Sequence, residues 1–298
     1  MNKFMPVLAL LMLTLVWSYN WTVMKSVLPY IGAFEFAALR AIFGACILFL
    51  VLIATHRPLT PPPLLPTIVV GVLQTAGMTS LGQLALITGG VGTTAVLTYS
   101  MPFWVIIFAA IFLKERMSGL QKIAFAIAAA GFVCILRPWE DNIPLLSFIL
   151  ALSSGIAWAC GSVTFKRLYA RQKIDLLGFT TWQMLFGALL LIVLAFATHS
   201  RPIIWSGVAG ALAYNAFLAT ALAWVLWLFI LKSLPTSIAG LSSLLVPVTS
   251  IFFAWICINE VPDLYEALGI ALIVFALLLI SLPGLLHVIK KKACTNHA

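Results

Sequence analysis

Long apolar runs without charged residues recur along the chain at the length of membrane-spanning helices. Residues 4–24, 142–165 and 267–289 contain no Asp, Glu, Lys or Arg. A helix of about 20 residues crosses the hydrocarbon core of a bilayer, which is roughly 30 Å thick. The runs lack the alternation of apolar and polar residues that the strands of a membrane barrel need. Since lipid offers no hydrogen-bond partners to an open backbone, the runs are predicted to be helices.

The pattern predicts an all-α integral membrane fold with ten transmembrane helices. The expected helices lie near residues 5–24, 32–54, 67–87, 92–113, 119–136, 145–165, 176–198, 204–230, 236–258 and 266–286. The loops are short, and the prolines within residues 56–63 mark the clearest break, because proline cannot continue a helix.

Composition agrees with lipid as the main solvent. The chain is 63% hydrophobic and 8% charged, with a mean hydropathy of +1.14, whereas a soluble domain carries about 25% charged residues. The expected contacts are therefore membrane lipid and a small-molecule substrate. No soluble output domain of the kind a receptor-like sensor needs fits between the predicted helices.

The basic residues are distributed unevenly between the two sides of the membrane. With ten spans, 13 of the 17 Lys and Arg residues fall on the side of both termini, whereas only Lys25, Arg137 and Arg201 fall on the other. Positive charge accumulates on the cytoplasmic side, so both termini are predicted to be cytoplasmic and the protein to lie in the inner (plasma) membrane. The net charge of +9 thus reflects topology and anionic lipid rather than nucleic acid.

Residues with catalytic or metal-binding potential are scattered. The five cysteines and four histidines show no spacing for a metal site or a disulfide framework. No nucleophile–base constellation or phosphate-binding loop is present, and an enzyme acting on lipid would need clustered His, Asp or Glu. The sequence predicts a protein that is not an enzyme and uses no cofactor and no metal.

The chain aligns with itself at a shift of roughly 141–145 residues. The matched pairs include Trp17 with Trp158, Lys25 with Lys166, Phe36 with Phe179, Pro102 with Pro247, and Glu115 with Glu260. The alignment predicts two five-helix repeats, 5–136 and 145–286, followed by a basic cytoplasmic tail, 287–298. Because five is odd, the second repeat enters the membrane from the opposite side. Inverted repeats are common in secondary transporters, whose solute site lies near the midplane.

Several short motifs in both halves resemble a known family. They are TrpSerTyrAsnTrpThrValMetLys (17–25), AlaAlaLeuArg (37–40), MetProPheTrp (101–104) before LeuLysGluArg (113–116), TrpAlaCysGlySer (158–162), TrpGln (182–183) and SerLeuLeuValProVal (243–248). In this order they resemble the EamA-type ten-helix exporters of the drug/metabolite transporter superfamily. The resemblance implies export of small metabolites, often amino acids or their relatives, through a central cavity.

Arg40 is the clearest candidate for solute binding, because ionisable residues inside a bilayer are costly. One interpretation is that it faces the cavity and attracts a carboxylate. The other is that it reaches the outer interface or pairs with Glu35. No Asp or Glu lies in the central part of a predicted span, which argues against a proton-coupled carboxylate mechanism and against bare cations as substrates.

Aromatic and small polar residues complete the candidate site. Trp17 and Trp21 share one helix face with Asn20, although an interfacial aromatic belt is the alternative explanation. The predicted substrate-binding residues are Trp17, Asn20, Trp21, Arg40, Gln74, Thr98, Tyr99, Trp158, Trp182, Gln183, Tyr214, Asn215 and Ser243. The predicted hinges are Pro102 and Pro247, since each removes a backbone donor.

These observations predict a transporter that exports small organic metabolites by alternating access, with amino acids or related zwitterions as the favoured substrates. A multidrug or hydrophobic-compound exporter is the alternative, because aromatic side chains suit both kinds of solute. The sequence leaves energy coupling and oligomeric state open, and a monomer is the simplest expectation.

Overall fold

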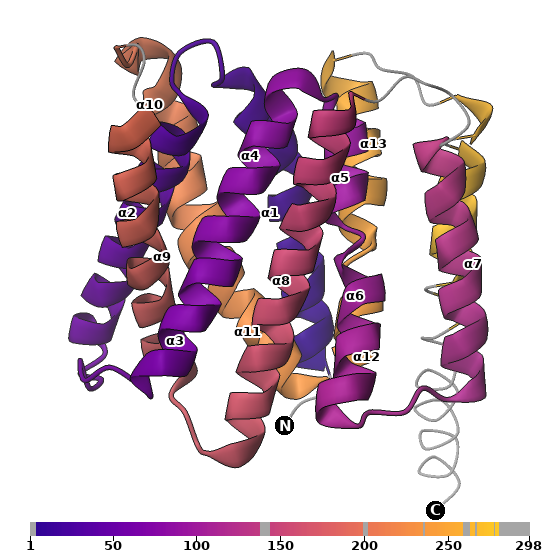
Figure 1. Ribbon diagram of the computed structural model, residues 1–298, viewed down its shortest axis with the longest axis horizontal. Helices are drawn as coiled ribbons and strands as arrows, with labels where there is room; N and C mark the ends of the chain where they lie inside the picture. Colours follow the sequence, from indigo (N-terminus) through magenta and orange to yellow (C-terminus); the bar gives the residue numbers. More distant parts are fainter. Residues whose placement is uncertain are drawn as a thin grey trace, which may run out of the picture.

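The computed structural model describes residues 4–137, 144–198, 202–234, 236–258, 263–265, 267–276 and 278–279. Within these ranges all regular secondary structure is helical (Figure 1). The elements of the first half are α1 (Phe4–Ser26), α2 (Ala33–Ala54), α3 (Leu64–Val70), η1 (Gly71–Gly77), α4 (Met78–Thr88), α5 (Val91–Thr98), α6 (Met101–Phe108), η2 (Ala109–Leu113) and α7 (Gly119–Leu136). Those of the second are α8 (Leu145–Arg171), α9 (Leu176–Thr198), α10 (Trp205–Tyr214), η3 (Asn215–Leu222), α11 (Ala223–Ser233), α12 (Thr236–Ser242) and α13 (Leu245–Ile258).

Among the residues that the structure describes, eight helices are long and apolar enough to cross a membrane. They coincide with the first eight predicted spans, including 119–136, and the sixth continues beyond the predicted residue 165 to Arg171. The predicted spans 236–258 and 266–286 coincide with shorter apolar helices, Ile238–Phe253 and Ala267–Ala276. The predicted tail, 287–298, lies outside the described residues.

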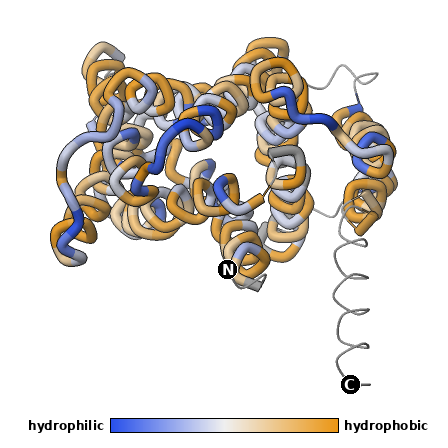
Figure 2. The backbone as a smooth tube through the Cα atoms, turned by 90° about the horizontal axis from the view of Figure 1, so that it is seen from below, coloured by the Kyte–Doolittle hydropathy of each residue, from blue (hydrophilic) through white to orange (hydrophobic). Residues whose placement is uncertain are grey.

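The outer surface of the bundle is apolar, as lipid contact requires. Large side chains such as Leu50 and Phe196 are exposed, and the tube seen from below is predominantly hydrophobic, with hydrophilic residues gathered in connecting segments (Figure 2). In a soluble protein such an apolar surface would drive aggregation. The distribution therefore fits a bundle whose outer face is solvated by lipid.

Two spans contain a π-helical segment at corresponding positions. In the first half η1 leads into α4, Met78–Thr88, and in the second η3 leads into α11, Ala223–Ser233. Close packing accompanies η1, because a Cβ at Gly71 would lie 2.4 Å from the Gln183 carbonyl oxygen on α9. Glycine is needed there for the two backbones to approach.

Two other spans are interrupted near the predicted hinges. A turn at Tyr99 and Ser100 separates α5 from α6, and a turn at residues 243–244 separates α12 from α13. Pro102 and Pro247 lie within the first turn of α6 and of α13, where their missing N–H groups are tolerated. Each short turn contains a backbone hydrogen bond of 3.0 Å that spans three residues, from Phe103 N to Ser100 O and from Val246 N to Ser243 O.

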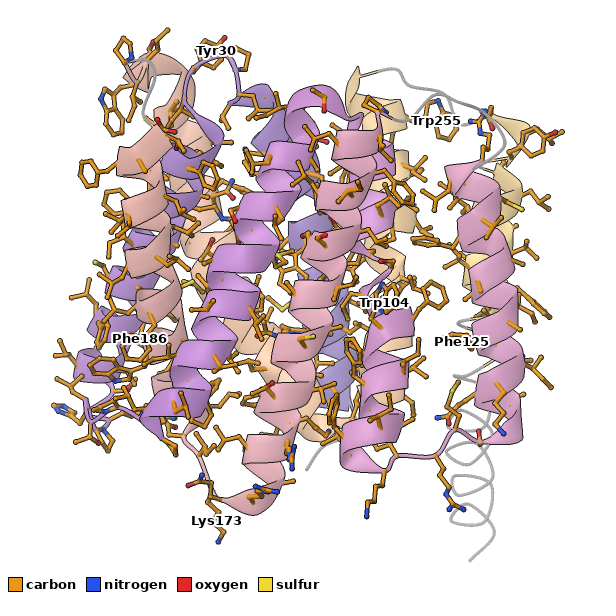
Figure 3. The ribbon with its side chains drawn as sticks, in the orientation of Figure 1. Tyr30, Trp104, Phe125, Lys173, Phe186 and Trp255 are labelled. Atoms are coloured by element: carbon orange, nitrogen blue, oxygen red, sulfur yellow. The ribbon has the colours of Figure 1, made fainter. Side chains whose placement is uncertain are left out.

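Two lysines bind the carbonyl ends of helices at opposite ends of the bundle. Lys25 Nζ donates to Leu86 O at 2.6 Å and to Gly89 O at 3.0 Å, at the end of α4. Lys166 Nζ donates to the matching carbonyl oxygens of α11 and its C-cap, those of Leu231 at 2.5 Å and Leu234 at 2.7 Å. Figure 3 shows Tyr30, which follows α1, at one end of the bundle and Lys173, which follows α8, at the other. Each lysine satisfies acceptors that a helix terminus leaves open.

Candidate functional site

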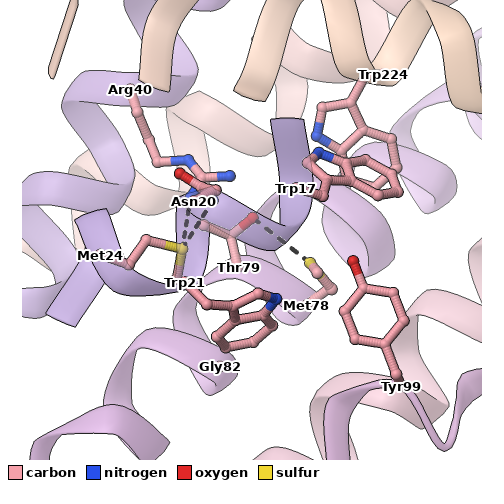
Figure 4. Close-up of a pocket in the computed structure, with 10 residues that line it drawn as sticks. All are labelled: Trp17, Asn20, Trp21, Met24, Arg40, Met78, Thr79, Gly82, Tyr99 and Trp224. Carbon is pink, nitrogen blue, oxygen red and sulfur yellow. Dashed lines mark hydrogen bonds between the residues drawn. The ribbon is translucent and has the colours of Figure 1, made fainter. Parts of the chain in front are cut away.

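A small cavity lies between α1, α2, α4, the turn after α5, and α11 (Figure 4). Its lining residues are Trp17, Asn20, Trp21, Met24, Arg40, Met78, Thr79, Gly82, Tyr99 and Trp224. The cavity volume is about 20 Å³, which is room for roughly one water molecule. The cavity must therefore widen before it admits an organic solute.

Arg40 supplies the positive charge of this cavity. Its side chain is 5% exposed, and Nη1 donates to the Met24 sulfur at 3.2 Å. No carboxylate among the described residues forms an ion pair with it; the ion pairs found there join Arg57 to Asp175 and Arg137 to Asp263. A thioether is a weak acceptor, so the guanidinium keeps donors for a ligand. The interpretation in which Arg40 reaches the interface does not fit this burial.

Asn20 lies beside Arg40 and shares its sulfur partner (Figure 4). Asn20 Nδ2 donates to the Met24 sulfur at 3.0 Å, while Oδ1 is buried without a hydrogen-bond partner. An unpaired buried acceptor is costly. The site therefore presents a cationic donor and a neutral acceptor side by side, which suits a solute that carries both a negative group and a donor.

Aromatic rings form the apolar wall of the cavity. Trp17 is fixed by a 3.0 Å hydrogen bond from Nε1 to Ala219 O, and its ring centroid lies 5.7 Å from that of Trp224. The Trp21 and Tyr99 centroids are 6.3 Å apart. All four rings are buried, so those on α1 face the bundle and do not form an interfacial belt. Rings placed in this way can bury an apolar body or stabilise a cation.

The structure brings five of the predicted site residues together at the cavity: Trp17, Asn20, Trp21, Arg40 and Tyr99. Trp158 lies directly behind them, with its ring 5.3 Å from that of Trp17 and 5.2 Å from that of Tyr99. Thr98 is buried, and its hydroxyl has no hydrogen-bond partner.

The other predicted site residues make contacts elsewhere in the bundle. Gln74 Nε2 donates to Ser162 Oγ at 2.8 Å, and Trp182 Nε1 donates to Leu59 O at 3.2 Å. Tyr214 Oη donates to Val16 O at 2.6 Å. Asn215 Nδ2 and Ser243 Oγ donate within their own segments, to Ala211 O at 3.1 Å and to Gly240 O at 2.6 Å. Gln183 is buried with neither polar side-chain atom hydrogen-bonded. None of these side chains lines the cavity in this structure.

Sequence reasoning missed five of the lining residues: Met24, Met78, Thr79, Gly82 and Trp224. Thr79 and Gly82 lie on one face of α4, three residues apart, a spacing that also occurs in ordinary helix packing. A signal that could have found them is an extension of the self-alignment to α4 and α11, because a shift of 145 residues matches Thr79 with Trp224 and Gly82 with Trp227. Among the described residues no group of three or more His, Cys, Asp or Glu could hold a metal ion.

An apolar helical bundle with eight candidate spans among the described residues, and with a buried cation and aromatic rings around a small internal cavity, defines a multi-pass membrane protein. The sequence profile of the EamA-like transporter family matches residues 4–137 and again residues 145–282. The chain belongs to the EamA-like transporter family and is a membrane transporter of the drug/metabolite type.

Curated relatives agree with this assignment over nearly their whole length. The chain is 28% identical to "Uncharacterized transporter YoaV" of Bacillus subtilis (strain 168), over 89% of this chain and 93% of the relative. It is 26% identical to "Probable amino-acid metabolite efflux pump" of Escherichia coli (strain K12), over 91% of this chain and 92% of the relative. A solved crystal structure superposes with a TM-score of 0.75 at 20% identity, over 93% of this chain and 96% of that one, which shows a common fold.

Proposed function

We propose that this transporter exports small organic metabolites from the cytoplasm across the inner membrane, with amino acids and related zwitterions as preferred substrates. The observation that carries the proposal is Arg40, a buried cation that faces the cavity and forms no ion pair with a described carboxylate. Such a charge is costly inside a membrane unless a counter-ion reaches it. A substrate carboxylate is a counter-ion of the right chemistry, since guanidinium binds carboxylates in a bidentate fashion.

The rest of the cavity suits the remainder of a zwitterion. Asn20 Oδ1 lacks a hydrogen-bond partner and can accept from a substrate ammonium. The faces of Trp17 and Trp224 offer cation–π contacts to that ammonium or apolar contact to a side chain. The relative named as a probable amino-acid metabolite efflux pump, 26% identical, supports the same substrate class.

We also propose that ten spans form two inverted five-helix repeats, 5–136 and 145–286, which exchange between inward-open and outward-open states. Three observations support this: the family profile matches each half, α4 and α11 occupy matching positions after a π-helical segment, and matched lysines bind helix ends at opposite ends of the bundle. The interruptions before Pro102 and Pro247 supply the hinges. Both termini, and with them the basic tail 287–298, are placed in the cytoplasm by the charge distribution.

Export of lipophilic drugs is the second candidate, because the aromatic wall formed by Trp17, Trp21 and Trp224 would accept a hydrophobic compound. A lipophilic cation would be repelled by Arg40, which carries the same sign of charge. The charge of the cavity therefore favours solutes that carry a carboxylate.

The test is flux in reconstituted vesicles with matched pairs of solutes. Tryptophan, tryptamine and a lipophilic cationic dye all have a large apolar part, but only tryptophan carries a carboxylate. We expect transport of the amino acid, little of its decarboxylated amine, and none of the dye; preference for tryptamine or the dye would overturn the proposal. Equal flux with and without a pH gradient is expected, because no Asp or Glu lines the cavity among the described residues.

A further inference from the structure

The cavity belongs almost entirely to the first half of the chain. Of its ten lining residues, nine precede residue 137, and only Trp224 comes from the second half. We infer that the solute is bound mainly by residues of the first half, with Trp224 of the second half as the opposite wall, and that Thr79 and Gly82 are specificity-determining residues that set the size of the solute. This inference rests on the proposed transport function. It explains why the residues that line the site come almost entirely from one half of the chain.

The two halves can be matched residue by residue along α4 and α11. The helices are Met78–Thr88 and Ala223–Ser233, an offset of 145 residues. The same offset relates Leu86 to Leu231, the carbonyl groups that the two lysines bind. With this offset Thr79 corresponds to Trp224, and Gly82 to Trp227. The first half thus has small residues where the second has its largest.

The difference in residue size between the matched positions explains why the cavity lies in the first half and not in the second. In the second half Trp227 packs on Trp158 with ring centroids 5.2 Å apart, and Trp224 lies 6.4 Å from the same ring. These rings are fully or almost fully buried and fill the region between α8 and α11. In the first half the matched positions on α4 carry Thr79 and Gly82, which line the cavity together with Trp17 and Trp21 (Figure 4). Trp17, the partner of Trp158 in the self-alignment, packs on Trp224 with ring centroids 5.7 Å apart, and the cavity occupies the space that the small residues leave.

The polar groups show the same asymmetry. Arg40 is matched by the uncharged Gln183, and Asn20 by Gly161. A Cβ at Gly161 would lie 2.4 Å from the Gln74 side chain, so that side chain closes the position where a second polar site would be. The second half therefore offers neither the room nor the charge, and it serves as the wall against which the solute is held.

Gly82 lies where an added side chain would reduce the cavity most directly. A Cβ there would lie 3.3 Å from Ser154 Oγ and 3.7 Å from the Trp21 ring. Gly82→Ala therefore needs only a small shift of a serine hydroxyl, and the bundle is expected to tolerate it. Thr79→Trp copies the residue that the second half already carries at the matched position.

The first experiment measures solute size selection in vesicles, as the ratio of initial rates for tryptophan and alanine. We expect Thr79→Trp to lower this ratio at least about tenfold. Gly82→Ala adds a single carbon atom and should lower the ratio less, since one methylene in a pocket changes discrimination by no more than roughly 10–200-fold. Ile87→Trp is the matched control, because that residue lies on α4 with its side chain 55% exposed. An unchanged ratio in Thr79→Trp and Gly82→Ala, or an equal change in Ile87→Trp, overturns the inference.

The second experiment needs no substrate and uses thiol labelling in a chain whose native cysteines are replaced by serine. Asn20→Cys should react with a small maleimide, whereas Ser162→Cys, at the position matched to Trp21, should stay protected. Adding Thr79→Trp should slow labelling of Asn20→Cys by a bulky maleimide more than by a small one. Equal reactivity at both positions, or no effect of Thr79→Trp, refutes a one-sided site. If the cysteine variants show this labelling but the wild-type chain transports no amino acid, the result counts against the proposed substrate class alone.

Discussion

Replacing Arg40 by methionine should weaken substrate binding without weakening the fold. The Arg40 side chain is 5% exposed and donates to the Met24 sulfur, so methionine keeps much of the apolar contact and removes the charge. Truncating one partner of a buried, hydrogen-bonded charge pair costs about 2–5 kcal/mol of binding free energy. We expect the lower end, because the cavity must open to water to admit the solute and water screens the pair. About 2 kcal/mol corresponds to a rise of roughly 30-fold in the dissociation constant.

Arg40→Met should weaken substrate binding but should not lower the stability of the protein. A buried charge without an ionic partner among the described residues pays a desolvation cost that a hydrogen bond to a thioether offsets only weakly. Removing it should leave the melting temperature of the detergent-solubilised protein unchanged or raise it. A guanidinium that held the bundle together would give a lower melting temperature instead.

The assay therefore has two readouts, the KM for amino-acid flux in vesicles and the melting temperature. Arg40→Lys is the matched control, because it keeps a charge but loses the bidentate geometry, and its KM should lie between those of the wild type and Arg40→Met. Arg40→Ala should also impair transport while leaving membrane insertion intact. A wild-type KM in Arg40→Met, or a loss of activity that follows a loss of stability, would refute the reasoning.

Three further predictions concern topology, hinge and packing. Cysteines placed at Lys25 and at Lys166 should react with membrane-impermeant thiol reagents from opposite sides, whereas labelling from one compartment contradicts the inverted repeat. Pro102→Ala restores a backbone donor and should slow turnover several-fold with little change in KM; an unaltered turnover number would show that the interruption is not a hinge. Gly131→Leu should destabilise the protein by about 1–3 kcal/mol in thermal melts, because a Cβ there would lie 2.7 Å from Gly269 O; a neutral effect would contradict that close helix contact.

Hydropathy predicted the spans well because lipid requires apolar side chains along the whole length of each helix. The eight long apolar helices of the described residues therefore coincide with predicted spans. The π-helical segments η1 and η3 could not be predicted, since their backbone differs from an α-helix only in which carbonyl each N–H reaches, and the side chains carry no distinct pattern for it. The Gly71 contact with α9 became visible only once the two helices were placed together.

The candidate site was only partly predictable for a related reason. Trp17, Asn20 and Trp21 could be grouped because helical spacing places them on one face. The orientation of Arg40 could not be chosen, because in a membrane helix both the lipid-facing and the core-facing sides are apolar and amphipathicity gives little guidance. The side of the helix that carries Trp182 could not be chosen for the same reason. In the structure its Nε1 donates to Leu59 O in a loop, and the residue does not line the cavity.

The tryptophan cluster constrains how the proposed exchange between states can proceed. The rings of Trp17 and Trp158 lie 5.3 Å apart, and each of them lies 5.2–6.4 Å from the rings of Trp224 and Trp227, where α1, α8 and α11 meet. Interlocked buried rings resist gradual deformation. The interruptions after α5 and α12 lie in spans that contact each other, and at each of them turn hydrogen bonds replace the continuous α-helical ladder. Motion is therefore expected to concentrate at those interruptions, with the cluster as a fixed wall. In such a mechanism the solute stays bound to the first half while the access path changes from one side of the membrane to the other.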